Sequence, residues 1–228
     1  MLAADKVFLN VGTHAATPNV PGLDAGRPLT HIEALELDYL PPHLVVIGGG
    51  YVGLEMAQAY RRFGSDVTII EPGPRLMGWE DIDVSLEMQR ILSEEGIQVI
   101  LEAELFHVDG QSGDRVDLVV RTASGQKNID GSNILVAAGR VPNTGGIGLK
   151  EAGVELDSRR YIRVNGRLET SAPDVWRSEN ALAARISRTY PRTIFASFVT
   201  IWQEGIAARA IESLHTACSR IPRLPTWG

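Results

Sequence analysis

Apolar residues follow two different patterns along residues 1–140. Short continuous apolar runs bounded by Gly or Pro predict buried parallel strands, and they lie at 44–47, 67–70, 97–101 and 134–138. Apolar residues at helical spacing predict helices over 52–63 and 82–95, which Gly64 and Gly96 are expected to end. This alternation of strand and helix is typical of an α/β fold with an open, doubly wound sheet.

Other segments surround this pattern. Three short runs at 106–108, 116–121 and 127–129, separated by Gly-containing turns, predict an antiparallel meander before the last parallel strand. Residues 6–11 predict a short buried strand, and the Pro-rich residues 13–42 predict a crossing between domains. Residues 141–174 are interrupted by Gly, Pro and Asn, so they predict no long element.

The composition is that of a globular protein. The chain has 228 residues, 44% of them hydrophobic, and a formal net charge of −6, so wholesale disorder is not expected. No apolar run approaches the roughly 20 residues of a membrane span, and no basic face indicates nucleic acid. We therefore expect a cytoplasmic protein without membrane or nucleic-acid partners. The single cysteine, Cys218, excludes an intrachain disulfide, and no metal site is expected.

Candidate chemistry begins where the first parallel strand meets the first helix. Gly48-Gly49-Gly50-Tyr51-Val52-Gly53 has the G-x-G-x-x-G spacing of dinucleotide-binding turns, and it lies between a buried strand and a helix as that motif requires. The first glycine allows the tight turn, the second lets the backbone approach a pyrophosphate, and the third lets helix and strand pack closely. The helix N-terminus adds free N–H groups for the anion. The alternative is a turn that only joins strand to helix.

Charged residues near this turn bear on the cofactor. Glu71 follows the second strand, 23 residues after Gly48, where a carboxylate accepts hydrogen bonds from the adenosine ribose and repels a 2′-phosphate. The sequence therefore favours NAD(H) over NADP(H), although Arg75 could turn towards a phosphate. Glu55 has two open interpretations: it complements the helix dipole, or it faces the nicotinamide. The histidines form no catalytic or ligand cluster.

Three motifs, in order along residues 1–176, carry a resemblance to a known family. They are residues 7–13 (VFLNVGT) with Pro21-Gly22, residues 48–55 (GGGYVGLE) and residues 136–144 (VAAGRVPNT). With these motifs the chain resembles the pyridine nucleotide-disulfide oxidoreductases, the family of dihydrolipoamide dehydrogenase, glutathione reductase and mercuric reductase. Residues 10–13 and 78–81 favour the mercuric-reductase-like branch.

The resemblance implies a domain plan and further site residues. Residues 1–40 would be a partial FAD-domain segment and crossover, 41–140 the NAD(H)-binding domain, and 141–176 the return into the FAD domain. Tyr51 would be a gate at the nicotinamide face of the flavin, Leu105 would cover the adenine, and Gly139 would touch the nucleotide backbone. The expected cofactor-binding residues are thus Gly48, Gly49, Gly50, Tyr51, Val52, Gly53, Glu55, Glu71, Leu105 and Gly139.

The resemblance also implies a function and its limits. In the family, hydride passes from NAD(P)H to FAD and on to a disulfide or another small acceptor, such as mercuric ion or a quinone. The family's FAD-binding turn and Cys-x4-Cys pair would precede the position matched by Met1. We therefore expect a fragment of an FAD-dependent oxidoreductase that is inactive alone, has no catalytic residue apart from the gate, and does not form the family's homodimer. The alternatives are a non-catalytic dinucleotide-binding or regulatory module and a pseudogene product.

The segment after Trp176 departs from the rest of the chain. Residues 1–176 hold 15 basic and 25 acidic side chains, whereas residues 177–228 hold 7 and 3, and every basic one is an arginine. The family pattern there is A-x-G-D or A-x-G-E, but the sequence is Arg177-Ser178-Glu179-Asn180. If one nucleotide were lost after the Trp176 codon, one permitted restored translation would begin AIGECAGSPHF, which contains the motif. We therefore predict that residues 177–228 are out of frame, through a sequencing error or gene decay; the alternative is a divergent helical tail.

Overall fold

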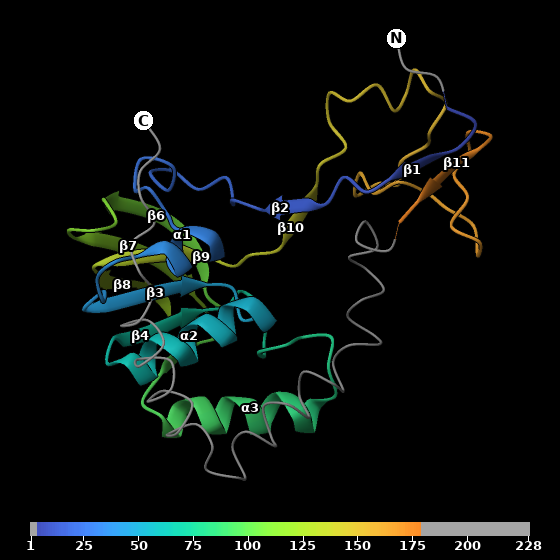
Figure 1. Ribbon diagram of the computed structural model, residues 1–228. Helices are drawn as coiled ribbons and strands as arrows, with labels where there is room; N and C mark the ends of the chain where they lie inside the picture. The colour runs from blue at the N-terminus through green and yellow to red at the C-terminus, as the bar shows by residue number, and fades with distance from the viewer. Residues whose placement is uncertain (1–3, 179–228) are drawn as a thin grey trace, which may run out of the picture.

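The computed structural model describes residues 4–178, which form a larger and a smaller lobe (Figure 1). The larger lobe is built around a four-stranded parallel sheet with the strand order β5-β4-β3-β9. Its strands are β3 (His43–Ile47), β4 (Asp66–Ile70), β5 (Gln98–Ile100) and β9 (Asn133–Val136). The four predicted apolar runs form these strands. The central strands β3 and β4 are buried along almost their whole length, as expected of parallel strands covered on both faces.

Helices cover one face of this sheet. They are α1 (His31–Glu36), α2 (Tyr51–Phe63) and α3 (Ile82–Glu94). The two longer helices were predicted, and α2 ends as expected at Gly64, whose φ of 113° is left-handed. Their buried residues pack with alternate strand positions in what we call the helix-side cluster. Its members include Leu44, Val46, Leu54, Ala57, Val67, Ile69, Leu76, Met77, Leu92 and Leu135.

An antiparallel sheet covers the opposite face. It consists of β6 (Glu104–Gly110), β7 (Val116–Thr122) and β8 (Gly125–Gly131), the predicted meander. The remaining strand positions, including Val45, Ile47 and Ile134, pack with this sheet in a second cluster. The expected α/β class is confirmed, but the arrangement differs from a sheet with helices on both faces. Since β6–β8 are amphipathic, they can bury the face that a helix would otherwise cover.

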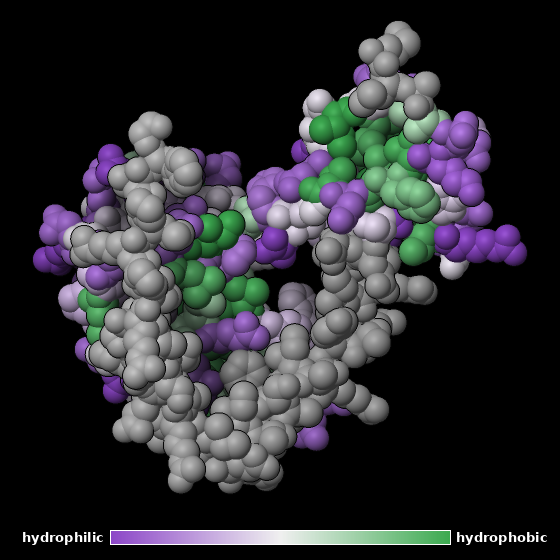
Figure 2. All heavy atoms as spheres, viewed as in Figure 1, coloured by the Kyte–Doolittle hydropathy of each residue, from purple (hydrophilic) through white to green (hydrophobic). Residues whose placement is uncertain are grey.

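The smaller lobe joins segments far apart in the sequence. Strand β1 (Val7–Leu9) pairs in parallel with β11 (Val175–Arg177), and β2 (Thr13–Ala15) pairs antiparallel with β10 (Arg140–Pro142) (Figure 1). A small cluster of Leu149, Val154, Ile162 and Ala172 is its core. Apolar side chains also reach its surface (Figure 2), where Phe8 is 67% exposed and stacks on Trp176 with 5.5 Å between ring centroids. A two-stranded parallel sheet is rarely left open in this way.

The predicted crossing is more ordered than its composition indicates. Leu23 is fully buried against β6–β8, and Leu29 forms a β-bridge with Leu135 of β9. Helix α1 was not predicted, although Thr30 and Glu33 form a capping box at its start, a signal that the sequence displays. The crossing thus packs on the larger lobe.

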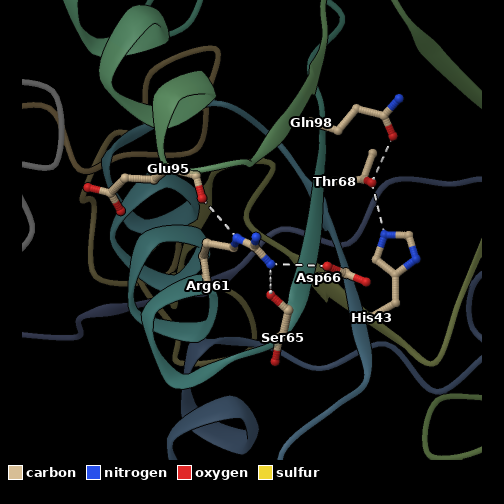
Figure 3. A network of polar contacts seen from close by, with 7 residues as sticks. All are labelled: His43, Arg61, Ser65, Asp66, Thr68, Glu95 and Gln98. Atoms are coloured by element: carbon tan, nitrogen blue, oxygen red, sulfur yellow. Dashed lines mark hydrogen bonds and ion pairs between the residues drawn. The ribbon is translucent and has the colours of Figure 1, made fainter.

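A polar network holds the amino ends of the strands together (Figure 3). Arg61 on α2 donates to the carbonyl oxygens of Glu95, at 2.9 Å, and Ser65, at 3.1 Å, and pairs with Asp66. Thr68 on β4 lies 2.9 Å from His43 Nε2 and donates to Gln98 at 3.1 Å, which joins β3, β4 and β5. This network lies at the end of the sheet opposite to the glycine turn, so it supports the fold and leaves the other end free for a ligand.

The predicted change of frame concerns residues that lie almost entirely outside the described ones. Two of them, Arg177 and Ser178, are described at the end of β11. Arg177 is 5% exposed. Arg177 Nε and Ser178 Oγ are buried and have no hydrogen-bond partner within residues 4–178. Buried polar atoms are normally paired, so these two atoms are exceptions among the described residues, although Arg177 Nη1 donates to the Ile162 carbonyl. Cys218 lies outside the described residues.

Candidate dinucleotide-binding site

The glycine turn lies at the carboxyl end of the parallel sheet, where open α/β sheets bind ligands. It follows β3 directly and opens α2, as predicted. Gly48 has a φ of 110°, and a Cβ atom there would lie 2.5 Å from the carbonyl oxygen of Ala137. A Cβ atom on Gly53 would collide with the carbonyl oxygen of Gly48. These two glycines are therefore required by the protein itself, for the tight turn and for the close approach of helix to strand.

Gly50 is different. Its backbone is extended with φ −85°, a conformation open to other residues. Among residues 4–178, its two chain neighbours apart, no atom lies within 4 Å of the position that a Cβ would take. At Gly49 the corresponding position is 2.6 Å from Leu76 Cδ2 and 3.1 Å from Glu71 Oε2. The turn is therefore closed at Gly49 and open at Gly50, as expected where a ligand approaches the backbone.

Glu71 is tied to the same turn. Its Oε2 accepts a hydrogen bond from the Gly49 N–H at 2.6 Å, and its Oε1 accepts one from the Gly73 N–H at 2.7 Å. The side chain is half-buried. Each carboxylate oxygen has two lone pairs, so both keep one for a further donor such as a ribose hydroxyl. Glu71 therefore lies beside the glycine turn, as predicted, and its hydrogen bond to Gly49 also stabilises the turn.

The loop between β4 and α3 closes one side of the site. Met77 donates its backbone N–H to the Gly49 carbonyl at 2.9 Å. Arg75 Nη2 donates to the carbonyl oxygens of Gly78, at 2.8 Å, and Glu80, at 3.4 Å. Its guanidinium thus binds its own loop. In the sequence, residues 78–81 stand out only as a family marker, and their spacing gives no sign of this contact with the site.

Tyr51 and Glu55 lie one helical turn apart on α2. The Tyr51 hydroxyl donates to the Glu80 carboxylate; burial raises the pKa of Tyr51, and this hydrogen bond raises it further. Burial also raises the pKa of the Glu55 carboxyl. Since α2 begins at Tyr51 and has no acidic residue in its first turn, Glu55 lies in the second turn. That position weakens the interpretation of Glu55 as a partner of the helix dipole, which acts mainly over the first turn.

Three other predicted residues lie near the turn or in the core. Val52 is 36% exposed on the first turn of α2. Leu105 is 9% exposed and belongs to the core between the two sheets, so covering an adenine stays a prediction. Gly139 has a φ of 123° and open space around its Cβ position, and its carbonyl accepts a hydrogen bond from the Ala16 N–H at 3.0 Å.

Two other features of the described residues do not compete with this site. An open hollow of 1010 Å³ lies in the smaller lobe, lined by glycines of residues 145–153 together with Arg160 and Arg163. Arg163 is already paired with Glu155 at 3.0 Å, and Glu151 and Lys150 add one charge of each sign to the lining. Within residues 4–178 no group of three His, Cys, Asp or Glu side chains could hold a metal ion, and no helix there is long and apolar enough to cross a membrane.

The comparisons with known proteins agree with this geometry. Residues 1–178 match the family described as pyridine nucleotide-disulphide oxidoreductase, and the chain belongs to that family. It is 31% identical to mercuric reductase from Bacillus cereus over 208 residues, 91% of this chain and 31% of that protein. It is 42% identical to dihydrolipoyl dehydrogenase from Thermus scotoductus over 138 residues, 60% of this chain and 30% of that protein.

The fold is also similar to that of a solved structure. The flavoprotein disulfide reductase RclA from Escherichia coli, as its Cu(II) complex, has a TM-score of 0.69 and 29% identity, covering 78% of this chain and 40% of that chain. The chain thus spans well under half the length of these relatives. The Bacillus alignment extends past residue 178, where the family match ends.

Proposed function

We propose that residues 41–140 form the NADH-binding part of an FAD-dependent pyridine nucleotide-disulfide oxidoreductase. The single observation that carries this proposal is the contrast within the turn: Gly48 and Gly53 are fixed by the protein's own packing, whereas Gly50 faces open space. A glycine with no steric need inside the protein is explained by a ligand that must approach the backbone.

The residues present fit a dinucleotide. The first turn of α2 offers backbone N–H groups and a positive dipole end to a pyrophosphate at Gly50. Glu71 is placed to accept hydrogen bonds from the adenosine ribose, and Gly139 borders the same end of the sheet. NADH is preferred to NADPH, because the Glu71 carboxylate would repel a 2′-phosphate and Arg75 binds its own loop. When bound, NADH supplies a hydride, which in the whole protein passes to FAD and on to a disulfide, mercuric ion or similar acceptor.

The described residues do not fit FAD by themselves. In the smaller lobe, β1 is followed by the residues that lead into β2, with no helix between them, so no phosphate-binding turn of the strand-to-helix kind is formed there. We therefore propose that this chain alone binds NADH but not FAD, and we expect it to show no flavin-dependent turnover. The second candidate function is a dinucleotide-binding module without redox chemistry. The open space at Gly50 supports it equally.

The test is a titration of the purified chain with NADH and NADPH, together with its visible absorbance before and after FAD is added. Saturable NADH binding, weaker NADPH binding and no flavin absorbance support the proposal as stated. Bound flavin that NADH reduces would show that the chain carries more of the enzyme than we assign to it. If a folded chain shows no saturable binding of either nucleotide, the proposed NADH-binding function is overturned. A chain without a cooperative thermal transition would instead be the pseudogene product.

A further inference from the structure

Strand β1 lies at an edge of the smaller lobe. Within residues 4–178 it pairs only with β11. The Val7 N–H donates to the Asp174 carbonyl at 2.9 Å, and the Leu9 carbonyl accepts the Ser178 N–H at 3.0 Å. Since backbone groups alternate between the two edges of a strand, the N–H and C=O of Phe8 point to the opposite edge. No strand of the described residues covers that edge, and such an edge is a template for another strand.

One face of this strand pair is also uncovered. The Phe8 ring is 67% exposed and stacks on Trp176, and Lys6 Nζ lies 6.0 Å from the centroid of the Trp176 ring. These side chains therefore share one face, and they contribute to the apolar surface of the smaller lobe (Figure 2). Leu9 packs on the opposite face, against the core of the lobe. An open edge and an exposed aromatic face thus meet at Phe8.

The segment 6–10 can pair with a second copy of itself. In an antiparallel pair with its two-fold axis at Phe8, the two Phe8 residues exchange N–H···O=C bonds, and Lys6 lies opposite Asn10 of the second copy. All residues with outward backbone groups are then paired, and each lysine faces a neutral amide. The two Phe8 rings become neighbours, which is a favourable cross-strand pair. An axis at Lys6 would instead place two lysines opposite each other, which is unfavourable.

We propose that two copies of this chain associate through β1, with the strand order β11-β1-β1-β11 in one continuous sheet. Trp176 and Phe8 of both copies then form a row of aromatic rings on one face. The resemblance implies that the chain does not form the family's homodimer, whereas this pairing needs only β1. It does not depend on the binding of a nucleotide. Because the paired segment is short, we expect a dissociation constant between micromolar and millimolar.

The experiment is sedimentation velocity of the full chain over this range of concentrations. The wild-type chain should change from monomer to dimer as its concentration rises. Asn10→Lys places a lysine opposite each Lys6 and should weaken the dimer roughly threefold to tenfold. Adding Lys6→Glu should restore it, because each new lysine then faces a glutamate. Asn128→Lys adds the same charge to an exposed position of β8, the edge strand of the other sheet, and as the matched control it should have no effect.

A further variant removes the pairing directly. Phe8→Pro deletes the outward N–H but no hydrogen bond to β11, a position at which an edge strand accepts proline. It should abolish the dimer and keep the thermal transition of the chain. The charge variants give their answer whether or not Phe8→Pro folds.

Three results would overturn the inference. The first is a wild-type chain that stays monomeric at millimolar concentration. The second is a dimer that Asn10→Lys and Asn128→Lys weaken equally, because its interface would then lie elsewhere. The third is a dimer that Asn10→Lys weakens and the added Lys6→Glu does not restore, because Lys6 and residue 10 would then not face each other.

Hydrogen exchange gives an independent readout. The Val7 amide is bonded to Asp174 within one copy, so its protection should not depend on the concentration of the chain. The Phe8 amide faces the open edge, so its exchange should become slower as the dimer forms. Exchange at Phe8 that is equally fast in monomer and dimer would show that β1 is not the interface.

Discussion

The Glu71 carboxylate accepts a hydrogen bond from the Gly49 N–H at 2.6 Å, and this bond ties the end of β4 to the turn that follows β3. The same carboxylate binds the Gly73 N–H at 2.7 Å, so one side chain spans the turn and the neighbouring loop. Hydrogen bonds to an ionised group are stronger than neutral ones. Glu71 therefore stabilises the conformation of the glycine turn in the absence of a ligand. Its expected contact with the ribose is a second role.

Replacing Glu71 should affect stability and selectivity together. A glutamine has only one carbonyl oxygen, so Glu71→Gln keeps at most one of the two backbone bonds and should lower the free energy of unfolding by about 1–2 kcal/mol. It should also weaken NADH binding and reduce the preference over NADPH. Denaturant unfolding and titrations with both nucleotides measure these effects. Glu104→Gln, at an exposed carboxylate, is the control; equal effects of the two variants would contradict the role of Glu71.

The second and third glycines of the motif, Gly50 and Gly53, should respond differently to an added methyl group. Gly50→Ala meets no atom of another described residue beyond its chain neighbours, so stability should stay within about 0.5 kcal/mol of wild type. NADH affinity should fall at least roughly tenfold, because the methyl group blocks the approach of the ligand to the backbone. Gly53→Ala meets the Gly48 carbonyl and should lower stability by about 3 kcal/mol, as overpacking does. Thermal melts and NADH titrations distinguish the two. Loss of stability without loss of binding in Gly50→Ala would refute the assignment of the open space to a ligand.

The elements that the sequence predicted well are those whose pattern is local. The run at 44–47 and the helix ended by Gly64 depend on apolar spacing and one left-handed residue. The residue that could not be predicted is Glu80, because its contact with Tyr51 joins two elements 29 positions apart. Spacing along the chain gives no information on such a contact.

Three further differences between prediction and structure have separate causes. The sequence left open whether Arg75 turns towards a phosphate, and only its hydrogen bonds to Gly78 and Glu80 decide its position in the structure. The pairing of β1 with β11 joins segments at opposite ends of the described chain, and the sequence indicated it only through the family resemblance, which assigned residues 1–40 and 141–176 to the FAD domain. Helix α1 is a local element that was overlooked, since Thr30 and Glu33 carry its signal.

The Glu55 carboxyl should make stability depend on pH. Burial raises its pKa above the ordinary value of 4.5, so the folded chain holds this proton more tightly than the unfolded chain. The contribution is favourable at low pH and is lost as the pH rises through the raised pKa. Glu55→Gln should therefore raise the melting temperature near neutral pH, and the difference from wild type should shrink below pH 4.5. Exposed Glu104→Gln should show no such trend. A stabilisation independent of pH would contradict burial as the cause.

Arg177 and Ser178 are the first two residues after the predicted change of frame, and both have buried polar atoms without a partner among the described residues. Burial lowers the pKa of the Arg177 guanidinium, which the Asp157 carboxylate only partly offsets. The Arg177 Nη1 does donate to the Ile162 carbonyl, but the surrounding cluster is apolar. One permitted restored translation places alanine and isoleucine at these positions, and both side chains are free of polar atoms.

Substitutions at these two positions should therefore stabilise the chain, which is the opposite of what most core substitutions do. Arg177→Ala with Ser178→Ile removes the two buried polar atoms that have no partner among residues 4–178, and it should raise the free energy of unfolding by about 1–2 kcal/mol. Denaturant unfolding measures it, with exposed Arg167→Ala as the control for the loss of a positive charge. A destabilised double variant would show that Arg177 belongs to this fold. Resequencing gives the genetic test: a frame that is intact through the Trp176 codon, with no base missing relative to close relatives, would rule out the change of frame.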